Sequence, residues 1–127
     1  MKAKIISRAD TDSLDAMVEI SDVKYMIRDK LNKDVDVGDE ANITFSITLI
    51  DDYTTPKSVI SAKNDKEKKL QQIAGVKYRA FGEITSLNPL TIDCGITKFI
   101  EAFSVNDSIK LGQFVAFDIL VLSAYSE

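Results

Sequence analysis

The stretch Ile43-Thr44-Phe45-Ser46-Ile47-Thr48-Leu49 alternates apolar and polar side chains without a break. Successive side chains of a β-strand point to opposite faces, so this pattern predicts a strand with one face in a core and the other in solvent. Gly38 precedes the stretch, and Gly112, 74 residues later, precedes a second run with apolar residues at alternate positions. These are Val115, Phe117, Ile119 and Val121. We interpret the two runs as one element that occurs twice, each glycine supplying a tight turn or bulge before its strand.

A second pair of segments repeats with nearly the same offset. Residues 14–20 (LDAMVEI) are similar to residues 90–96 (LTIDCGI), which lie 76 positions later. Each segment alternates apolar and polar residues, which is typical of a half-buried strand. One further strand is predicted before each segment and another after it, at residues 2–7, 78–85, 23–27 and 99–103.

The chain is therefore expected to be a single domain, residues 1–127, made of two similar strand-rich halves at residues 2–50 and 78–124. Each half has about 45–50 residues and is marginal for independent folding, so the simplest solution packs both into one core. The expected fold class is all-β with one short helix, as a small β-barrel or a sandwich, with two tandem barrels as the alternative. The three-strand start and the glycine-led long strand resemble OB-like and SH3-like barrels. This is an analogy of fold alone, because such folds host many functions.

The segment that joins the halves, residues 51–77, contains apolar residues at rough helical spacing. Asn64 is suited to cap a helix, and Glu67, three residues later, would complete a capping box. Gly75 stands where a helix commonly ends. The sequence therefore predicts a short helix over residues 65–74, with a mobile loop as the alternative.

Residue types that carry enzyme chemistry are scarce in this chain. It has no histidine, which removes the commonest general base and the commonest metal ligand, and it has one cysteine, Cys94. It also lacks the glycine-rich motifs that bind phosphates or dinucleotides. We therefore expect a protein that is not an enzyme, with no catalytic residues, no cofactor and no metal site.

Hydropathy indicates a protein without a membrane span. The longest uninterrupted apolar run, residues 119–122, is far shorter than the roughly 18 residues needed to cross a bilayer. The N-terminal residues lack the apolar run of about 7–15 residues that a signal peptide would have. A cytoplasmic location is therefore expected, and the single cysteine agrees with it.

Charge is unevenly distributed along the chain. Residues 57–79 contain seven basic and two acidic residues, a net charge of +5, whereas the rest contains nine basic and eighteen acidic residues, a net charge of −9. A basic segment on an acidic body predicts contact with an anionic partner, although a solvated surface is the simpler interpretation. The candidate contact residues are Lys63, Lys66, Lys68, Lys69, Lys77 and Arg79.

Single-stranded nucleic acid would need aromatic platforms beside these cations. The candidates are Tyr25, Tyr53, Tyr78 and Phe81, and residues 78–81 even place an arginine between two aromatic residues. The simpler interpretation puts Phe81 in the core and Tyr78 at a strand edge, because aromatic residues in strands mostly pack.

The first half is rich in aspartate, with carboxylates at alternate positions in two expected loops, residues 10–13 and 34–39. Hard cations such as Ca²⁺ take oxygen ligands of this kind. Neither stretch matches the twelve-residue calcium loop, which needs a central glycine and a closing glutamate. Solvated loop carboxylates are therefore the preferred interpretation for Asp10, Asp12, Asp15, Asp22, Asp29, Asp34, Asp36 and Asp39.

Cys94 falls on the same alternating face as Ile92 and Ile96, so it is expected to be a buried thiol rather than a nucleophile. Asp93 beside it has no partner base nearby in the sequence. A hydrolase that uses only carboxylates stays open as an alternative, because a second carboxylate could meet Asp93 in three dimensions.

The C-terminal strand is apolar on its second face as well, through Phe114, Ala116, Leu120 and Leu122. Such a strand is expected to be covered on both sides or to form a contact surface. Together with the missing catalytic groups, this favours a non-enzymatic binding module that contacts another protein, with self-association as a further hypothesis. The alternatives are weak binding of single-stranded nucleic acid through residues 57–79 and a small ligand-binding or carboxylate-only enzyme domain.

Overall fold

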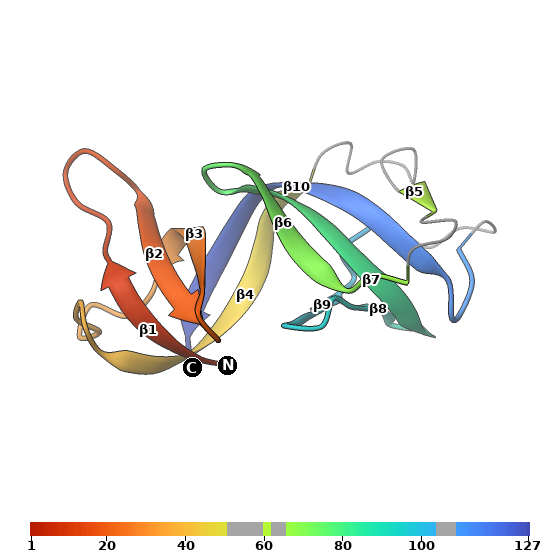
Figure 1. Cartoon of the computed structure of the whole chain (residues 1–127), viewed down its shortest axis with the longest axis horizontal. Helices are drawn as coiled ribbons and strands as arrows, with labels where there is room; N and C mark the ends of the chain where they lie inside the picture. The colour runs from red at the N-terminus through yellow and green to blue at the C-terminus, as the bar shows by residue number, and fades with distance from the viewer. Residues whose placement is uncertain (51–59, 62–65, 104–108) are drawn as a thin grey trace.

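The computed structural model describes residues 1–50, 60–61, 66–103 and 109–127 (Figure 1). All regular structure among these residues is β, which confirms the expected all-β class for the part described. The strands are β1 (Lys2–Ser7), β2 (Asp15–Ile20), β3 (Val23–Lys30), β4 (Glu40–Ile50), β5 (Ile60–Ser61), β6 (Lys69–Ala74), β7 (Lys77–Leu87), β8 (Leu90–Asp93), β9 (Lys98–Ile100) and β10 (Phe114–Ser126).

Five strands close into a ring in the first half. β1, β2 and β3 follow one another as an antiparallel meander, and β1 also pairs with β4. The last part of β10 lies antiparallel to β4, with Ser123 opposite Ser46, and parallel to β3, with Ser123 opposite Arg28. The parallel pairing closes the ring, so the C-terminal strand completes a unit otherwise built from the first 50 residues.

The second half is arranged around β7. This strand pairs with β6 on one part of its length and with β8 and β10 on its two edges, while β9 pairs with β8. Residues 114–119 of β10 pair with β7, and residues 121–126 pair with β4. One long strand therefore belongs to both halves, as Figure 1 shows for β10 in blue.

The two glycine-led turns make the same backbone contacts in each half. The Gly38 N–H donates to the Ile5 carbonyl (2.7 Å), and the Ile5 N–H donates to the Asp39 carbonyl (2.9 Å). The equivalent bonds in the second half run from Gly112 to Ile84 (2.8 Å) and from Ile84 to Gln113 (2.9 Å). Both glycines have a positive φ, 93° and 82°, which confirms the turn predicted before each long strand.

The predicted helix over residues 65–74 is wrong for the part that the structure describes. Residues 69–74 are strand β6, which forms an antiparallel hairpin with β7 around Gly75 and Val76. Gly75, with φ of 56°, turns this hairpin instead of ending a helix. Helix signals of this kind are weak, and pairing with the open edge of β7 gives one edge of the β6 backbone a ladder of hydrogen bonds. Asn64 and Asp65 lie outside the described residues.

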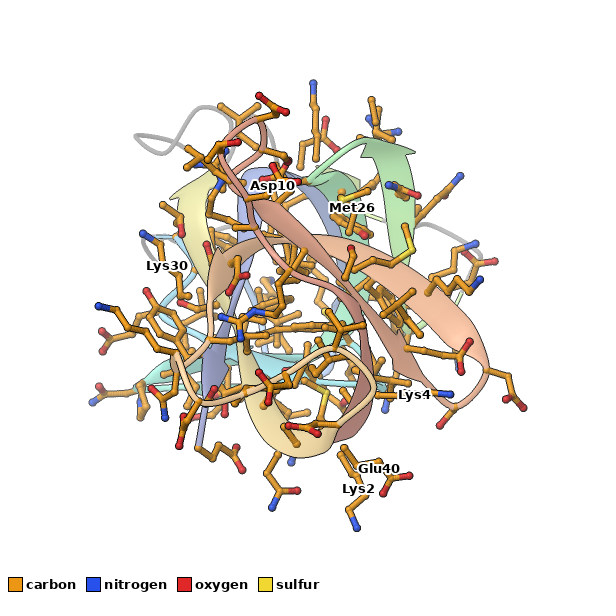
Figure 2. All side chains as sticks on the ribbon, turned by 90° about the vertical axis from the view of Figure 1, so that its left-hand side faces the viewer. Lys2, Lys4, Asp10, Met26, Lys30 and Glu40 are labelled. Atoms are coloured by element: carbon orange, nitrogen blue, oxygen red, sulfur yellow. The ribbon has the colours of Figure 1, made fainter. Side chains whose placement is uncertain are left out.

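The buried apolar side chains form one cluster that includes residues from both halves. Ile5, Val18 and Ile27 contribute from the ring, and Phe117 packs edge-on against Phe99 and Phe103 in the second half. Seen end-on, the first half carries charged side chains around this core, and Lys2, Lys4 and Glu40 extend outward on one side (Figure 2).

The C-terminal strand is covered by its own chain. Residues 115–117 and 122–124 of β10 are buried on both faces of the strand, including Ala116 and Leu122 of its second face. The other two residues of that face, Phe114 and Leu120, are half-buried. Of the two alternatives for this strand, the structure therefore supports the covered one.

Candidate functional site

A groove of about 830 Å³ lies between β4 and β9. Five consecutive residues of β4, residues 44–48, form one wall. Residues 98–102, which include all of β9, form the other, and Tyr125 of β10 also contributes. Binding sites for ligands commonly have volumes of about 300–1,000 Å³, so the groove is large enough to hold one.

The β4 wall follows from the alternation of the sequence. Phe45 points into the core, so Thr44, Ser46 and Thr48 point outward and form a row of polar side chains. The Thr48 hydroxyl is hydrogen bonded to the buried Ser123 on β10. Tyr125 lies opposite Thr44 in the β4–β10 pairing and therefore shares its face.

The β9 wall supplies the apolar part of the groove. Phe99 is buried, whereas Ile100 points outward and is 64% exposed. Tyr125 is 44% exposed and lines the same groove. Two large apolar side chains, one of them aromatic, are thus left open to solvent in a concave surface, which is characteristic of a contact site.

The groove continues toward the chain termini and has no excess of positive charge. A smaller hollow of about 340 Å³ shares Thr44 and Lys98 with it and extends to Met1 and Glu127. Lys98 and the N-terminal ammonium, which donates to the Ile43 carbonyl, are balanced by Glu101 and Glu127. Such mixed charge does not match the basic track that a nucleic-acid backbone requires.

The predicted basic site is largely neutralised by carboxylates from neighbouring strands. Lys68 lies 3.0 Å from Asp93 and 3.3 Å from Glu83, and Lys69 lies 3.1 Å from Glu67. The Lys69 ammonium also sits 5.0 Å from the centre of the Phe81 ring, a cation–π contact.

Arg79 is paired with a carboxylate of β10. Arg79 makes two hydrogen bonds to Asp118, of 2.7 and 3.2 Å, and these bonds lower the pKa of the Asp118 carboxyl. The charge of Lys77 lowers this pKa further. Lys66 is exposed, and Lys63 lies outside the described residues. The five described cations of the predicted site are thus surrounded by four carboxylates, which leaves a net charge of +1.

The aromatic platforms predicted for nucleic acid are not assembled. Tyr25 and Tyr78 are buried, with ring centres 6.3 Å apart, so no base could stack on them. The Tyr78 hydroxyl accepts from the Met26 N–H (2.8 Å) and donates to the Met26 carbonyl (2.9 Å). Tyr78 therefore joins β7 to β3 instead of lying at an exposed strand edge. Phe81 is half-buried, and Tyr53 lies outside the described residues.

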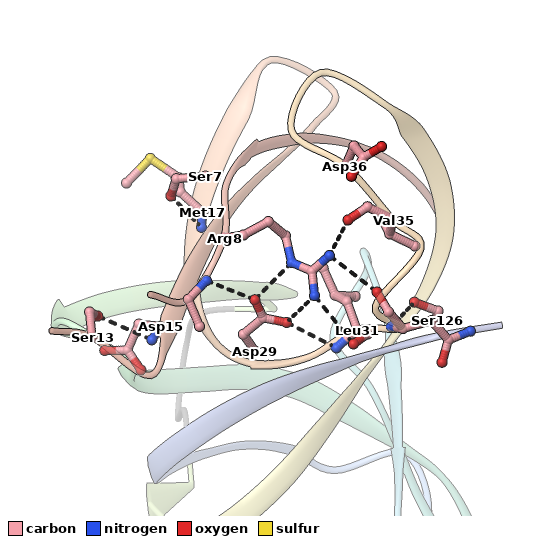
Figure 3. Close-up of polar contacts among 12 residues, drawn as sticks. Ser7, Arg8, Ser13, Asp15, Met17, Asp29, Leu31, Val35, Asp36 and Ser126 are labelled. Carbon is pink, nitrogen blue, oxygen red and sulfur yellow. Dashed lines mark hydrogen bonds and ion pairs between the residues drawn. The ribbon is translucent and has the colours of Figure 1, made fainter. Parts of the chain in front are cut away.

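The prediction of solvated aspartates is wrong for Asp29, whose side chain is 3% exposed. Arg8 binds it through two hydrogen bonds, of 2.8 and 3.2 Å, and the N–H groups of Ala9 and Leu31 add two more (Figure 3). Burial alone would raise the pKa of Asp29, but these bonds and the charge of Arg8 lower it overall. The remaining Arg8 N–H groups donate to the carbonyls of residues 31, 32 and 35. These hydrogen bonds join the residues that follow β1 to β3 and to the loop after β3, so the Arg8–Asp29 ion pair has a structural role.

Other aspartates of the first half hold turns together. Asp10 accepts from the N–H groups of residues 12 and 13 and points outward, and Asp39 accepts from the Asp36 N–H (2.9 Å). Asp15 pairs with Arg28 across the β2–β3 hairpin (3.0 Å). Within the described ranges, no three acidic, histidine or cysteine side chains gather in a way that could hold a metal ion.

Cys94 is buried, as predicted. Burial and the nearby charge of Asp93 raise the pKa of its thiol to about 12, so it is not a thiolate at neutral pH. Asp93 does meet a second carboxylate, because Glu83 lies opposite it on β7, but Lys68 sits between the two. The hydrogen bonds from the Gly95 N–H and from Lys68 lower the pKa of Asp93. The arrangement is an ion-pair network with an ionised Asp93, which cannot donate a proton at neutral pH.

The groove was not among the sites predicted from the sequence. The alternation of apolar and polar residues did identify the outward-facing Thr44, Ser46 and Thr48 on β4. The position of β9 beside them depends on how the two halves pack. In the predicted strand over residues 99–103, alternation places Ile100 on the face opposite the buried Phe99. That alternation was the one local signal that could have indicated an exposed position.

Comparisons of the chain with protein-family models, curated proteins and solved structures give no significant match. Among the described residues, no helix has the length and apolar character to cross a membrane.

Proposed function

We propose that this protein is a non-enzymatic interaction module that binds another protein in the groove between β4 and β9. The observation that carries the proposal is the pair of exposed apolar side chains, Ile100 and Tyr125, in a groove walled by two strands. Protein contact sites typically place such apolar anchors at the centre of a polar rim. Here Thr44, Ser46 and Thr48 would provide the polar surroundings.

Charge supports a protein partner over nucleic acid. The groove has acidic and basic groups in similar number, and the basic segment is paired with Glu67, Glu83, Asp93 and Asp118. Binding of nucleic acid would have to break those pairs before the cations could reach a phosphate backbone. The nucleic-acid alternative therefore keeps two cations of the predicted set without an ion pair within the described residues, the exposed Lys66 and the half-buried Lys77.

We also infer that the five-stranded ring is a small barrel of the OB-like kind. The meander β1–β2–β3, the closing parallel pair β3–β10 and the shared strand β10 support this interpretation. The second half would then be a related unit that contributes β10 to the first. Such a fold does not by itself indicate the function, so the proposal rests on the groove.

Two variants with equally exposed apolar residues test the proposal. Ile100 lines the groove and Leu111 does not, and each is 64% exposed. Ile100→Glu and Leu111→Glu would be compared with the native protein as baits in untreated and in nuclease-treated lysate of the source organism. Captured proteins would be quantified by mass spectrometry, and circular dichroism would check that each bait is folded.

We expect a protein retained by the native bait and by Leu111→Glu to fall at least about tenfold with Ile100→Glu, because a buried charge would replace an anchor. Equal retention by the two variants would refute the groove as the binding site. Partners that disappear only on nuclease treatment would favour the nucleic-acid alternative.

A further inference from the structure

The backbone of β9 presents hydrogen-bonding groups to the groove. The Cys94 N–H donates to the Thr97 carbonyl (2.9 Å), and the Glu101 N–H donates to the Leu90 carbonyl (2.7 Å). Bonded pairs alternate along an antiparallel ladder, so between these two bonds the β8–β9 ladder bonds through Phe99. The N–H and C=O groups of Lys98 and Ile100 therefore point away from β8.

The facing edge of β4 has the same property. The Glu127 N–H donates to the Asn42 carbonyl (2.9 Å) on the β10 side, and the Ile43 N–H donates to the Met1 carbonyl (2.7 Å) on the β1 side. By the same alternation, Phe45 and Ile47 turn their backbone groups to the edge opposite β10. In the described part of the chain, no strand pairs with that edge of residues 44–48, and none pairs with β9 except β8.

Two open strand edges thus line one groove. Figure 1 shows β9 and the C-terminal part of β10 on opposite sides of β4. Five residues of β4 form the wall, and an extended chain of that length spans about 17 Å.

On the basis of the proposed function, we propose that the partner is an extended polypeptide segment that adds to β9 as a further strand. Its backbone would bond to the N–H and C=O groups of Lys98 and Ile100, which repeat every two residues, about 6.7 Å apart, as in any strand. A phosphodiester backbone has acceptors but no N–H donors, so it could not bond to both the N–H and the C=O groups as a polypeptide strand does. Side chains of the segment would pack against Ile100 and Tyr125.

The charges beside β9 define the preferred segment. Lys98 begins the strand and Glu101 follows its end, so an acidic residue near the former and a basic residue near the latter would complement the site. A short edge strand with a lysine also resists indiscriminate pairing. The two features together favour a selected partner strand over general aggregation.

Proline at position 100 separates strand addition from other modes of binding. Proline has no N–H, and it is accepted in edge strands where the N–H points away from the sheet, as that of Ile100 does. Ile100→Thr keeps the N–H and a β-branched side chain, and it removes only part of the apolar contact. Both variants would be checked by circular dichroism and thermal unfolding against the native protein.

The probe is a displayed library of random linear peptides of about nine residues, long enough to exceed the groove. Peptides would be selected on the native protein, and the affinity of the enriched ones measured on the native protein, Ile100→Pro, Ile100→Thr and Ile100→Glu. We expect Ile100→Pro to weaken binding about tenfold or more and Ile100→Thr to weaken it less, because only proline removes a backbone bond.

Peptides that lose affinity on Ile100→Glu but bind Ile100→Pro as well as Ile100→Thr would overturn strand addition while the groove remains the binding site. Failure to enrich any peptide, or enriched peptides indifferent to Ile100→Glu, would overturn the groove proposal and strand addition together.

Discussion

Replacing Tyr78 with phenylalanine removes one oxygen atom from the joint between the two halves. That oxygen makes two hydrogen bonds to Met26, accepting from its N–H and donating to its carbonyl. The Tyr78 side chain is 1% exposed, so water cannot readily replace the hydroxyl. Each lost bond should cost about 1 kcal/mol, and the free energy of unfolding should therefore fall by about 2 kcal/mol.

Urea unfolding followed by circular dichroism measures this change, and for a chain of this size it corresponds to a Tm lower by about 6–10 °C. Tyr25→Phe is the matched control, because Tyr25 is also a buried tyrosine in contact with Tyr78. Its hydroxyl has no hydrogen bond within the described residues, so we expect a change below about 0.5 kcal/mol. If Tyr78→Phe is no more destabilising than Tyr25→Phe, the two bonds do not join the halves and the argument fails.

Tyr78→Phe should also change how the free energy of unfolding depends on pH above pH 10. Burial raises the pKa of Tyr78 to about 12, from the ordinary value of 10. Below pH 10 the phenol is neutral in both the folded and the unfolded chain, so its contribution to stability is fully present. Between pH 10 and 12 only the unfolded chain loses the proton, which costs the folded state up to about 3 kcal/mol. Tyr78→Phe should show a correspondingly shallower loss of stability over this range, and an unchanged slope would contradict the assignment.

Three further predictions concern other parts of the molecule. Asp29→Asn leaves the Arg8 guanidinium without its buried counter-ion, so stability at neutral pH should fall by about 2–3 kcal/mol in urea unfolding. Because the folded pKa of Asp29 is lowered, its contribution is present above the ordinary aspartate pKa and is lost as pH falls below it, and the difference between native and variant should shrink in acid. Gly82→Ala should destabilise the protein by about 1–3 kcal/mol in the same assay, because a Cβ there would lie 2.6 Å from the Asp93 carbonyl oxygen; a neutral result would mean that β7 and β8 can separate at little cost. The triple variant K66Q, K68Q and K69Q should give the same fluorescence anisotropy with a labelled oligothymidylate as the native protein at physiological salt. If the native protein binds the oligonucleotide in a salt-dependent way and the triple variant does not, the nucleic-acid alternative is restored.

Much of the strand layout was predictable from local pattern. The alternation of residues 43–49 predicted a strand with Phe45 inside and Thr44 outside, and the structure has both. The predicted bounds of residues 2–7 are those of β1. This works because the side-chain period of a strand is a property of the backbone, so burial of one face leaves a signal in each segment separately. The glycine turns were predictable for the same local reason, since a positive φ favours glycine.

Local sequence pattern gave a wrong prediction where a segment could either form a helix or pair with a neighbouring strand. Residues 69–74 have helix-forming residues and a suitable terminal glycine, yet they form β6 because the edge of β7 is available to pair. Propensity is a weak preference of under 1 kcal/mol per residue, and a ladder of hydrogen bonds with partial burial of Leu70 outweighs it. The sequence of residues 69–74 does not determine which strand they pair with.

The all-β class, the faces of the main strands and the turns at Gly38 and Gly112 can all be derived from local sequence pattern. Three features depend on the folded arrangement: β10 serves both halves, Arg8 neutralises Asp29, and β9 lies beside β4. The residues that create them are far apart along the chain. Alternation and turn chemistry act between neighbouring residues, whereas ion pairs and open edges depend on which strands pack together and which edges stay without a partner.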